Sequence, residues 1–109
     1  MNAFLKGAFV ANAASMGFNW IYNMTYLEKL SQSQSLVFQP VDLQKYKRAG
    51  KSYLGYPNAQ IGDISVQGEI AKWLYSALSS NPSLDIEAYE QLLYEMIRPG
   101  GSYHGYIES

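Results

Sequence analysis

The sequence predicts an all-α protein, and two observations lead to that prediction. Apolar residues recur at the three- and four-residue spacing of amphipathic helices in several segments. No segment of strand length alternates apolar and polar residues. With 109 residues, the chain has the length of one small domain. We therefore predict a single helical domain over residues 1–109, in which a few helices pack around one long irregular stretch.

The longest apolar run of the chain, residues 3–23, predicts the first helix and a turn after it. Small residues recur along the run at helical spacing, and Gly17 can close the helix. We expect a buried helix whose small face packs tightly on a neighbour, so that leucine in place of Gly7 would be destabilising. Asn12 interrupts the apolar surface, and the aromatic and amide side chains after Gly17 indicate a polar turn that lines a pocket.

Three further helices follow from local patterns. Residues 25–28 form a capping box, which predicts a short helix over about 26–32. Helical periodicity returns over about 65–79 and again from 85 until a proline and two glycines stop it. Between them, residues 35–62 show little periodicity and several glycines and prolines, which predicts a long loop. Loops of that length are uncommon in compact domains and are often functional.

Composition excludes several classes of function. The net charge is −1 and no basic block is present, so a nucleic-acid partner is not expected. The chain has no cysteine, which rules out disulfides, thiolate catalysis and zinc sites built on cysteine. A cytoplasmic location is the simplest expectation.

A signal peptide and a membrane span are the alternatives for the first apolar run. The apolar stretch before the Ala11–Ala13 cleavage-like motif is too short for a secretory signal and contains glycine. A spanning helix needs about 20 apolar residues, and Lys6, Asn12 and Asn19 interrupt the run. We therefore expect no membrane partner.

One cationic cluster lies in the predicted loop, and it contains Lys45, Lys47, Arg48 and Lys51. We interpret it as a solvated loop face. The alternative is that these charges attract an anionic group of a ligand.

Asp63 and Ser65 are the candidates for a metal site. Both lie at the start of the predicted helix, where side-chain oxygens cap free amides, and the residues alone favour a cap for Asp63. The same oxygens suit Mg²⁺, which keeps several waters and needs few protein ligands. Glu69 lies on roughly the opposite side of that helix and is a poor second ligand. No residue is assigned a catalytic role.

Three segments, in this order, resemble the ADP-ribosylglycohydrolase family. Residues 7–23, Gly-Ala-Phe-Val-Ala-Asn-Ala-Ala-Ser-Met-Gly-Phe-Asn-Trp-Ile-Tyr-Asn, are similar to the family's opening helix and turn. Residues 50–65 end in Gly-Asp-Ile-Ser, which is similar to the family's Gly-Asp-x-Thr. Residues 99–108 end in Tyr-His-Gly-Tyr-Ile-Glu and resemble its Tyr-x-Gly-Tyr/Trp-x-Asp/Glu segment.

The resemblance implies an orthogonal helical bundle and Mg²⁺-assisted hydrolysis of an N- or O-glycosidic bond to ADP-ribose. ADP-ribose or an ADP-ribosylated substrate would then be the partner. Carried over by position, Asp63 and Ser65 would lie on the metal side. The residues that would line the substrate side are Asn12, Asn19, Tyr22 and Asn23.

The chain departs from the family's pattern at three of these positions. Asn12 and Asn23 stand where aspartate is common, and Asn19 stands where histidine is common. An amide is a weaker metal ligand than a carboxylate and cannot act as a general base at neutral pH. The chain also has no counterpart of the family's C-terminal carboxylates. We therefore predict a truncated, N-terminal part of the fold with an incomplete or degenerate site.

A non-catalytic binding or assembly module is the alternative function. The asparagine replacements and the tyrosine-rich tail after Pro99 favour it, since the tail would leave apolar surface uncovered. Its partner would be another protein or a second copy of this chain, which leaves a homo-oligomer open.

Overall fold

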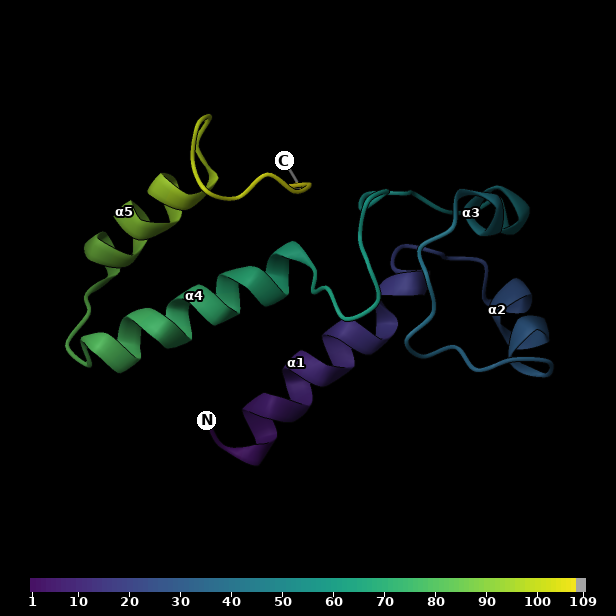
Figure 1. Cartoon of the computed structure of the whole chain (residues 1–109), viewed down its shortest axis with the longest axis horizontal. Coiled ribbons are helices and arrows are strands. Elements are labelled where there is room, and N and C mark those ends of the chain that lie inside the picture. Colours follow the sequence, from purple (N-terminus) through teal and green to yellow (C-terminus); the bar gives the residue numbers. More distant parts are fainter. Residues whose placement is uncertain (108–109) are drawn as a thin grey trace. The chain divides into compact units, whose positions relative to one another are not determined.

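The computed structural model describes residues 1–107, and its regular structure is helical (Figure 1). Within that range there is no β-strand, only an isolated antiparallel bridge between Ile21 and Ser52. The prediction of an all-α protein is therefore confirmed. The elements are α1 (Ala3–Ser15), the 3₁₀ helix η1 (Met16–Phe18), α2 (Met24–Ser31), α3 (Leu43–Ala49), α4 (Val66–Ser80) and α5 (Ile86–Ile97).

The chain forms two compact units, Met1–Ser65 and Val66–Ser109. The first holds α1, η1, α2 and α3, and the second holds α4 and α5. Nothing beyond residue 107 is described, so Glu108 of the third family-like segment lies outside the described residues. The assignment of one domain to the whole chain stays a prediction.

α1 is exposed, which corrects the expectation of a buried helix. No residue of α1 is buried, and the side chain of Phe4 is 87% exposed. A methyl group added at Gly7 would meet nothing within 4 Å, so the predicted tight packing at Gly7 is wrong. The close approach occurs at Gly17 instead, where an added Cβ would overlap the backbone of Gln39. Gly17 lies inside η1, because α1 already ends at Ser15.

α2 begins at Met24, one residue before the predicted capping box. Asn23 is its N-cap, and the Asn23 Oδ1 accepts a hydrogen bond from the Tyr26 amide at 3.1 Å. The Asn23 Nδ2 also donates to the Ala49 carbonyl oxygen at 2.9 Å, which holds this cap in place. The capping box from Thr25 to Glu28 is therefore wrong, because an asparagine with a tertiary anchor already caps the helix.

The core of the first unit lies around the end of α3, inside the stretch predicted as a loop. Ile21, Tyr46 and Ala49 are buried there. α3 is short, is capped by Asp42 through the Gln44 amide at 2.9 Å, and ends at Gly50 with φ of 78°. Seven residues give too few turns for a clear periodic signal. The residues packed around this core are Phe18, Tyr26, Leu27, Val41 and Leu54.

The two helices of the second unit match their predicted positions. α4 begins at Val66 and α5 begins after Asp85, whose Oδ1 accepts from the Ala88 amide at 2.8 Å. After α5 the chain turns back, and the Tyr103 amide donates to the Met96 carbonyl oxygen at 2.9 Å. Among residues 1–107, every helix is too short or too polar to cross a bilayer.

Candidate functional site

The Asn12 side chain and Ser65 form a reciprocal pair. The Asn12 Nδ2 donates to the Ser65 Oγ at 2.8 Å, and the Ser65 amide donates to the Asn12 Oδ1 at 2.8 Å. Ser65 is only 4% exposed. Both ends of the Asn12 amide are thus engaged with one buried residue. This pair joins the first and second family-like segments, which the sequence alone could not place together.

Asp63 lies two positions before this pair and is exposed. Its Oδ2 accepts a hydrogen bond from the Gln60 amide at 2.9 Å and closes a tight turn, in which Gly62 has φ of 101°. The expectation that Asp63 caps the following helix is therefore wrong. Its other carboxylate oxygen accepts no hydrogen bond within residues 1–107, so Asp63 fits a ligand of a hydrated Mg²⁺ ion.

Ser65 fits a metal less well than Asp63 does. Its side chain is buried and its hydroxyl oxygen already accepts from Asn12. Residues 1–107 contain no group of three or more histidine, aspartate or glutamate side chains that could hold a metal ion. A metal here would rely on Asp63 and water, and the assignment of Asp63 and Ser65 as ligands stays a prediction.

The predicted substrate-side residues after η1 have different surroundings. Asn23 is engaged as the cap of α2 and as the donor to Ala49. Tyr22 is 62% exposed, and its amide donates to the Lys51 carbonyl oxygen at 2.7 Å. Asn19 accepts from the Tyr46 hydroxyl at 2.7 Å through its backbone oxygen. The Asn19 Nδ2 is buried without an acceptor among the described residues, which is uncommon for a native polar group.

These contacts divide the predicted site residues into two groups. Asn12 lies with Ser65 near the turn of Asp63. Tyr22 and Asn23, together with Asn19, lie beside the end of α3. No hydrogen bond among the described residues joins the two groups directly.

Lys45 is a buried cation that sequence reasoning missed, and it corrects the solvated-face interpretation for this residue. Lys45 is 6% exposed, and its Nζ donates to the carbonyl oxygens of Pro40 at 2.8 Å and Gly17 at 3.2 Å. The same Nζ lies 4.0 Å from the centre of the Phe18 ring. Desolvation lowers the pKa of Lys45, and the nearby charge of Asp42 partly opposes that effect. No sequence signal identifies the carbonyl partners.

Trp20 is the second residue that the sequence did not single out. Its φ is 58°, in the left-handed region that bulky side chains avoid. This conformation places its ring 5.5 Å from Tyr56 in a stacked arrangement and 5.9 Å from Tyr53. A Cβ added at Gly55 would overlap the Trp20 ring, so glycine is required at that contact. Backbone strain of this kind is concentrated at functional sites.

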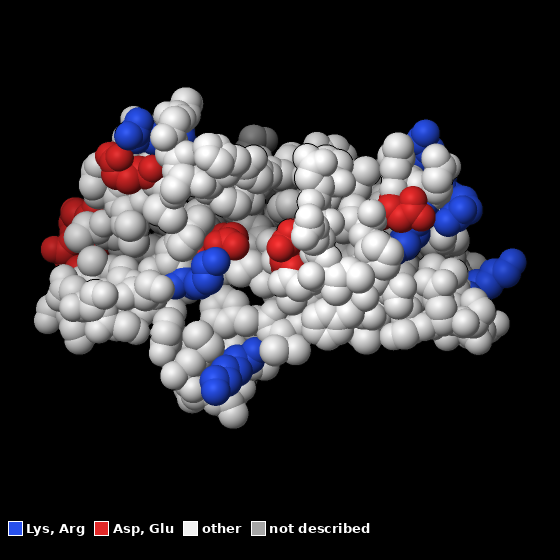
Figure 2. All heavy atoms as spheres, viewed as in Figure 1, with Lys and Arg blue, Asp and Glu red and all other residues white. Residues whose placement is uncertain are grey.

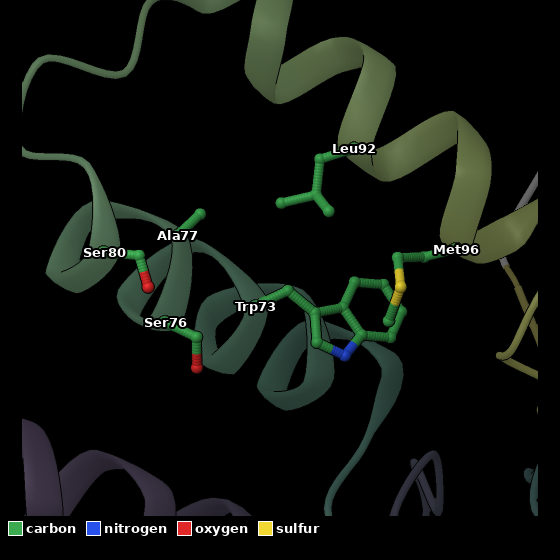
Figure 3. A pocket seen from close by; sticks show the side chains of 6 residues that line it. All are labelled: Trp73, Ser76, Ala77, Ser80, Leu92 and Met96. Atoms are coloured by element: carbon green, nitrogen blue, oxygen red, sulfur yellow. The ribbon is translucent and has the colours of Figure 1, made fainter.

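The second unit contains a separate apolar pocket of about 300 Å³ between α4 and α5 (Figure 3). No titratable side chain lines it, so the pocket offers no acid, base or metal ligand. It also contains none of the predicted site residues. Its lining consists of Trp73, Ser76, Ala77, Ser80, Leu92 and Met96.

Chemically, the predicted site residues of the first unit offer the accessible carboxylate of Asp63, several amides and the exposed ring of Tyr22. This set can bind and orient a polar aromatic ligand, and it holds one side chain suited to Mg²⁺. Comparison with known proteins adds no relative, since no family model, no curated protein and no solved structure matches the chain.

Proposed function

We propose that this chain binds an ADP-ribose-type ligand together with Mg²⁺, as an ADP-ribosylglycohydrolase-like protein with an incomplete site and the beginning of that family's orthogonal bundle. One observation carries the proposal. Asn12 and Ser65, which are 53 residues apart, form a pair that brings together two sequence segments resembling the family. The cytoplasm, the simplest expectation from the sequence, is the location that we propose.

Asp63 would hold the metal through its accessible carboxylate oxygen, with water completing the shell. A bound Mg²⁺ would orient the ligand and stabilise developing negative charge. Asn12 holds Ser65 in place and cannot accept a proton as a general base at neutral pH. We therefore propose that these residues bind the ligand. Hydrolysis of the glycosidic bond would be weak, because the site lacks further carboxylates.

A thermal melt with and without Mg²⁺ plus ADP-ribose tests this function. Ligand at about a hundred times its dissociation constant should add roughly 2.7 kcal/mol to the unfolding free energy. The variant Asp63→Asn should lose the part of the shift that depends on Mg²⁺. Glu90→Gln is the matched control, because Glu90 is an exposed carboxylate on α5. An unchanged melt at millimolar ligand contradicts the proposal.

An assembly module is the second candidate, and the exposure of α1 favours it. Phe4 is 87% and Val10 57% exposed, although both are large and apolar. Exposed apolar surface of this kind marks interaction sites. Light scattering across a concentration series measures the mass of the particle. A mass that rises with concentration supports self-association, and a clean monomer at every concentration rules it out.

A further inference from the structure

The pocket between α4 and α5 is an apolar recess with room for one more side chain. Its volume is about 300 Å³ and it is open to solvent. An apolar cavity of about 150 Å³ already admits a benzene ring. Leu92 and Met96 point from α5 toward the Trp73 ring of α4, so the walls of the pocket are largely apolar (Figure 3).

The two helices of the second unit leave much of their own apolar surface uncovered. Within residues 66–107 only Val66, Gly68 and Gly101 are buried, so the large side chains that line the pocket stay partly exposed. A unit of fewer than about 70 residues rarely supplies enough core on its own, and oligomerisation is one common remedy. A further apolar group is therefore expected to cover the pocket.

α1 carries one large side chain on an otherwise small, exposed face. Phe4 is 87% exposed. The residues three, four and seven positions further along share its face of the helix, and all of them are exposed. They are Gly7, Ala8 and Ala11. Because these neighbours are small, another surface can approach α1 closely there, and the Phe4 ring projects from that face.

The two units carry opposite net charge. Residues 66–109 contain six acidic and two basic side chains, whereas residues 1–65 contain three acidic and six basic ones. Three exposed glutamates lie on α5, and residues 1–27 include Lys6 and no acidic residue. Figure 2 shows acidic groups over α5 and basic groups over α3. Phe4 also lies in the first turn of α1, at the positive end of the helix dipole.

We propose that α1 of a second copy of this chain docks on the pocket between α4 and α5, with its Phe4 ring against Leu92 and Met96. A second α4–α5 pair in that place would bring acidic surface against acidic surface, so the charge favours α1 as the occupant. The contact joins two different surfaces, and two copies that exchange α1 close into a dimer. The inference rests on self-association, the second candidate function, and names the contact that produces it.

Two variants that block opposite halves of this contact test the proposal in the full chain. Phe4→Ala removes the projecting ring, and Ser76→Arg places a bulky cation at an exposed position that lines the pocket. Each variant alone should associate at least tenfold more weakly than wild type, because full burial of a phenylalanine side chain contributes about that factor or more. An equimolar mixture should form dimers that neither variant forms alone, since α1 of one fits the pocket of the other. Sedimentation velocity measures the masses.

Matched controls separate the contact from general effects of the substitutions. Val10 is exposed on another side of α1, and Ser79 is exposed on α4 outside the pocket. Val10→Ala and Ser79→Arg should therefore associate like wild type. Helical circular dichroism shows whether each variant is folded, and Ser80→Arg, also exposed at the pocket, replaces Ser76→Arg if that variant unfolds. Added salt should weaken the association, because opposite charges contribute to it.

Three results would overturn the proposal. A mixture of folded variants that stays monomeric removes this contact, and self-association of wild type would then use another surface. An equal loss in the control variants removes it too. A wild-type chain that is monomeric at every concentration removes both the contact and self-association. None of these results changes the thermal shift with Mg²⁺ plus ADP-ribose, so the proposed ligand binding stands or fails on its own test.

Discussion

Asn12 and Ser65 hold each other through two hydrogen bonds of 2.8 Å, although 53 residues separate them in sequence. The pair fixes the end of the first unit against α1. Because Ser65 is buried, removal of Asn12 would take away the acceptor to which its amide donates. The pair therefore has a structural role.

Replacement of Asn12 tests this structural role. Asn12→Leu leaves the Ser65 amide without its side-chain acceptor and should lower the unfolding free energy by about 1–3 kcal/mol. Asn12→Asp keeps an acceptor for the amide, and the Ser65 hydroxyl can rotate to donate to it, so the loss should be smaller. Urea unfolding followed by Trp20 emission in the Trp73→Phe background measures both. Equal losses for the two variants would show that the hydrogen bonds are not what Asn12 contributes.

Some elements could be predicted from the sequence because their signals are local. α4 and α5 combine helical periodicity with clear ends, and the structure has both. α3 escaped prediction because it is only seven residues long, although Asp42 before it and Gly50 after it are cap and stop signals. The prediction that α1 is buried was wrong for another reason. An apolar run shows that residues favour burial, but it does not show which surface covers them.

The same holds for the candidate site: residue identities could be read from the sequence, but their contact partners depend on the fold. The identity of Asn12 as a polar interruption was visible, but its partner Ser65 depends on the path of the chain between them. Lys45 resembled a solvated lysine, because the carbonyl groups of Gly17 and Pro40 that bind it carry no side-chain signal. Trp20 has a positive φ angle, which could not be predicted because bulky residues rarely adopt one.

Gly7→Ala tests the exposure of α1. Gly7 lies inside the helix, and an added methyl group has no neighbour within 4 Å. Alanine favours the helix over glycine by about 0.8–1.0 kcal/mol, so the variant should be more stable. Helical circular dichroism during thermal unfolding measures the change. Gly17→Ala is the contrasting variant and should be destabilising, because its methyl group overlaps the backbone of Gln39. A destabilising Gly7→Ala would mean that α1 packs against another surface in solution.

Lys45→Met tests the buried cation through its pH dependence. Desolvation lowers the pKa of Lys45 in the folded state below its value of 10.5 in the unfolded chain. Between these two values the unfolded state binds more protons, so the contribution of Lys45 to stability rises with pH there. The unfolding free energy of wild type minus that of Lys45→Met should therefore increase as pH approaches 10.5. Lys47→Met, which removes an exposed lysine from the same helix, is the control variant. A difference that falls with pH would contradict the assignment.

Tyr46→Phe tests the core of the first unit at higher pH. Burial raises the pKa of Tyr46 from 10.0 to about 12, and its hydroxyl donates to the Asn19 carbonyl oxygen at 2.7 Å. The neutral hydroxyl therefore stabilises the fold fully below pH 10, and this contribution is lost as pH rises toward 12. In that window the unfolded state releases the proton first, and the loss approaches about 1.4 kcal/mol for each pH unit.

Phenylalanine at position 46 has no proton to lose, so Tyr46→Phe should show a shallower decline of stability between pH 10 and 12. Below pH 10 the variant should be less stable than wild type by about 1 kcal/mol, the typical contribution of one hydrogen bond. The two stability curves should therefore converge as pH rises. Urea midpoints from pH 8 to 11.5, followed by Trp20 emission in the Trp73→Phe background, measure both effects. Tyr22→Phe removes an exposed hydroxyl and serves as the control. Curves that stay parallel would show that the Tyr46 hydroxyl is open to water.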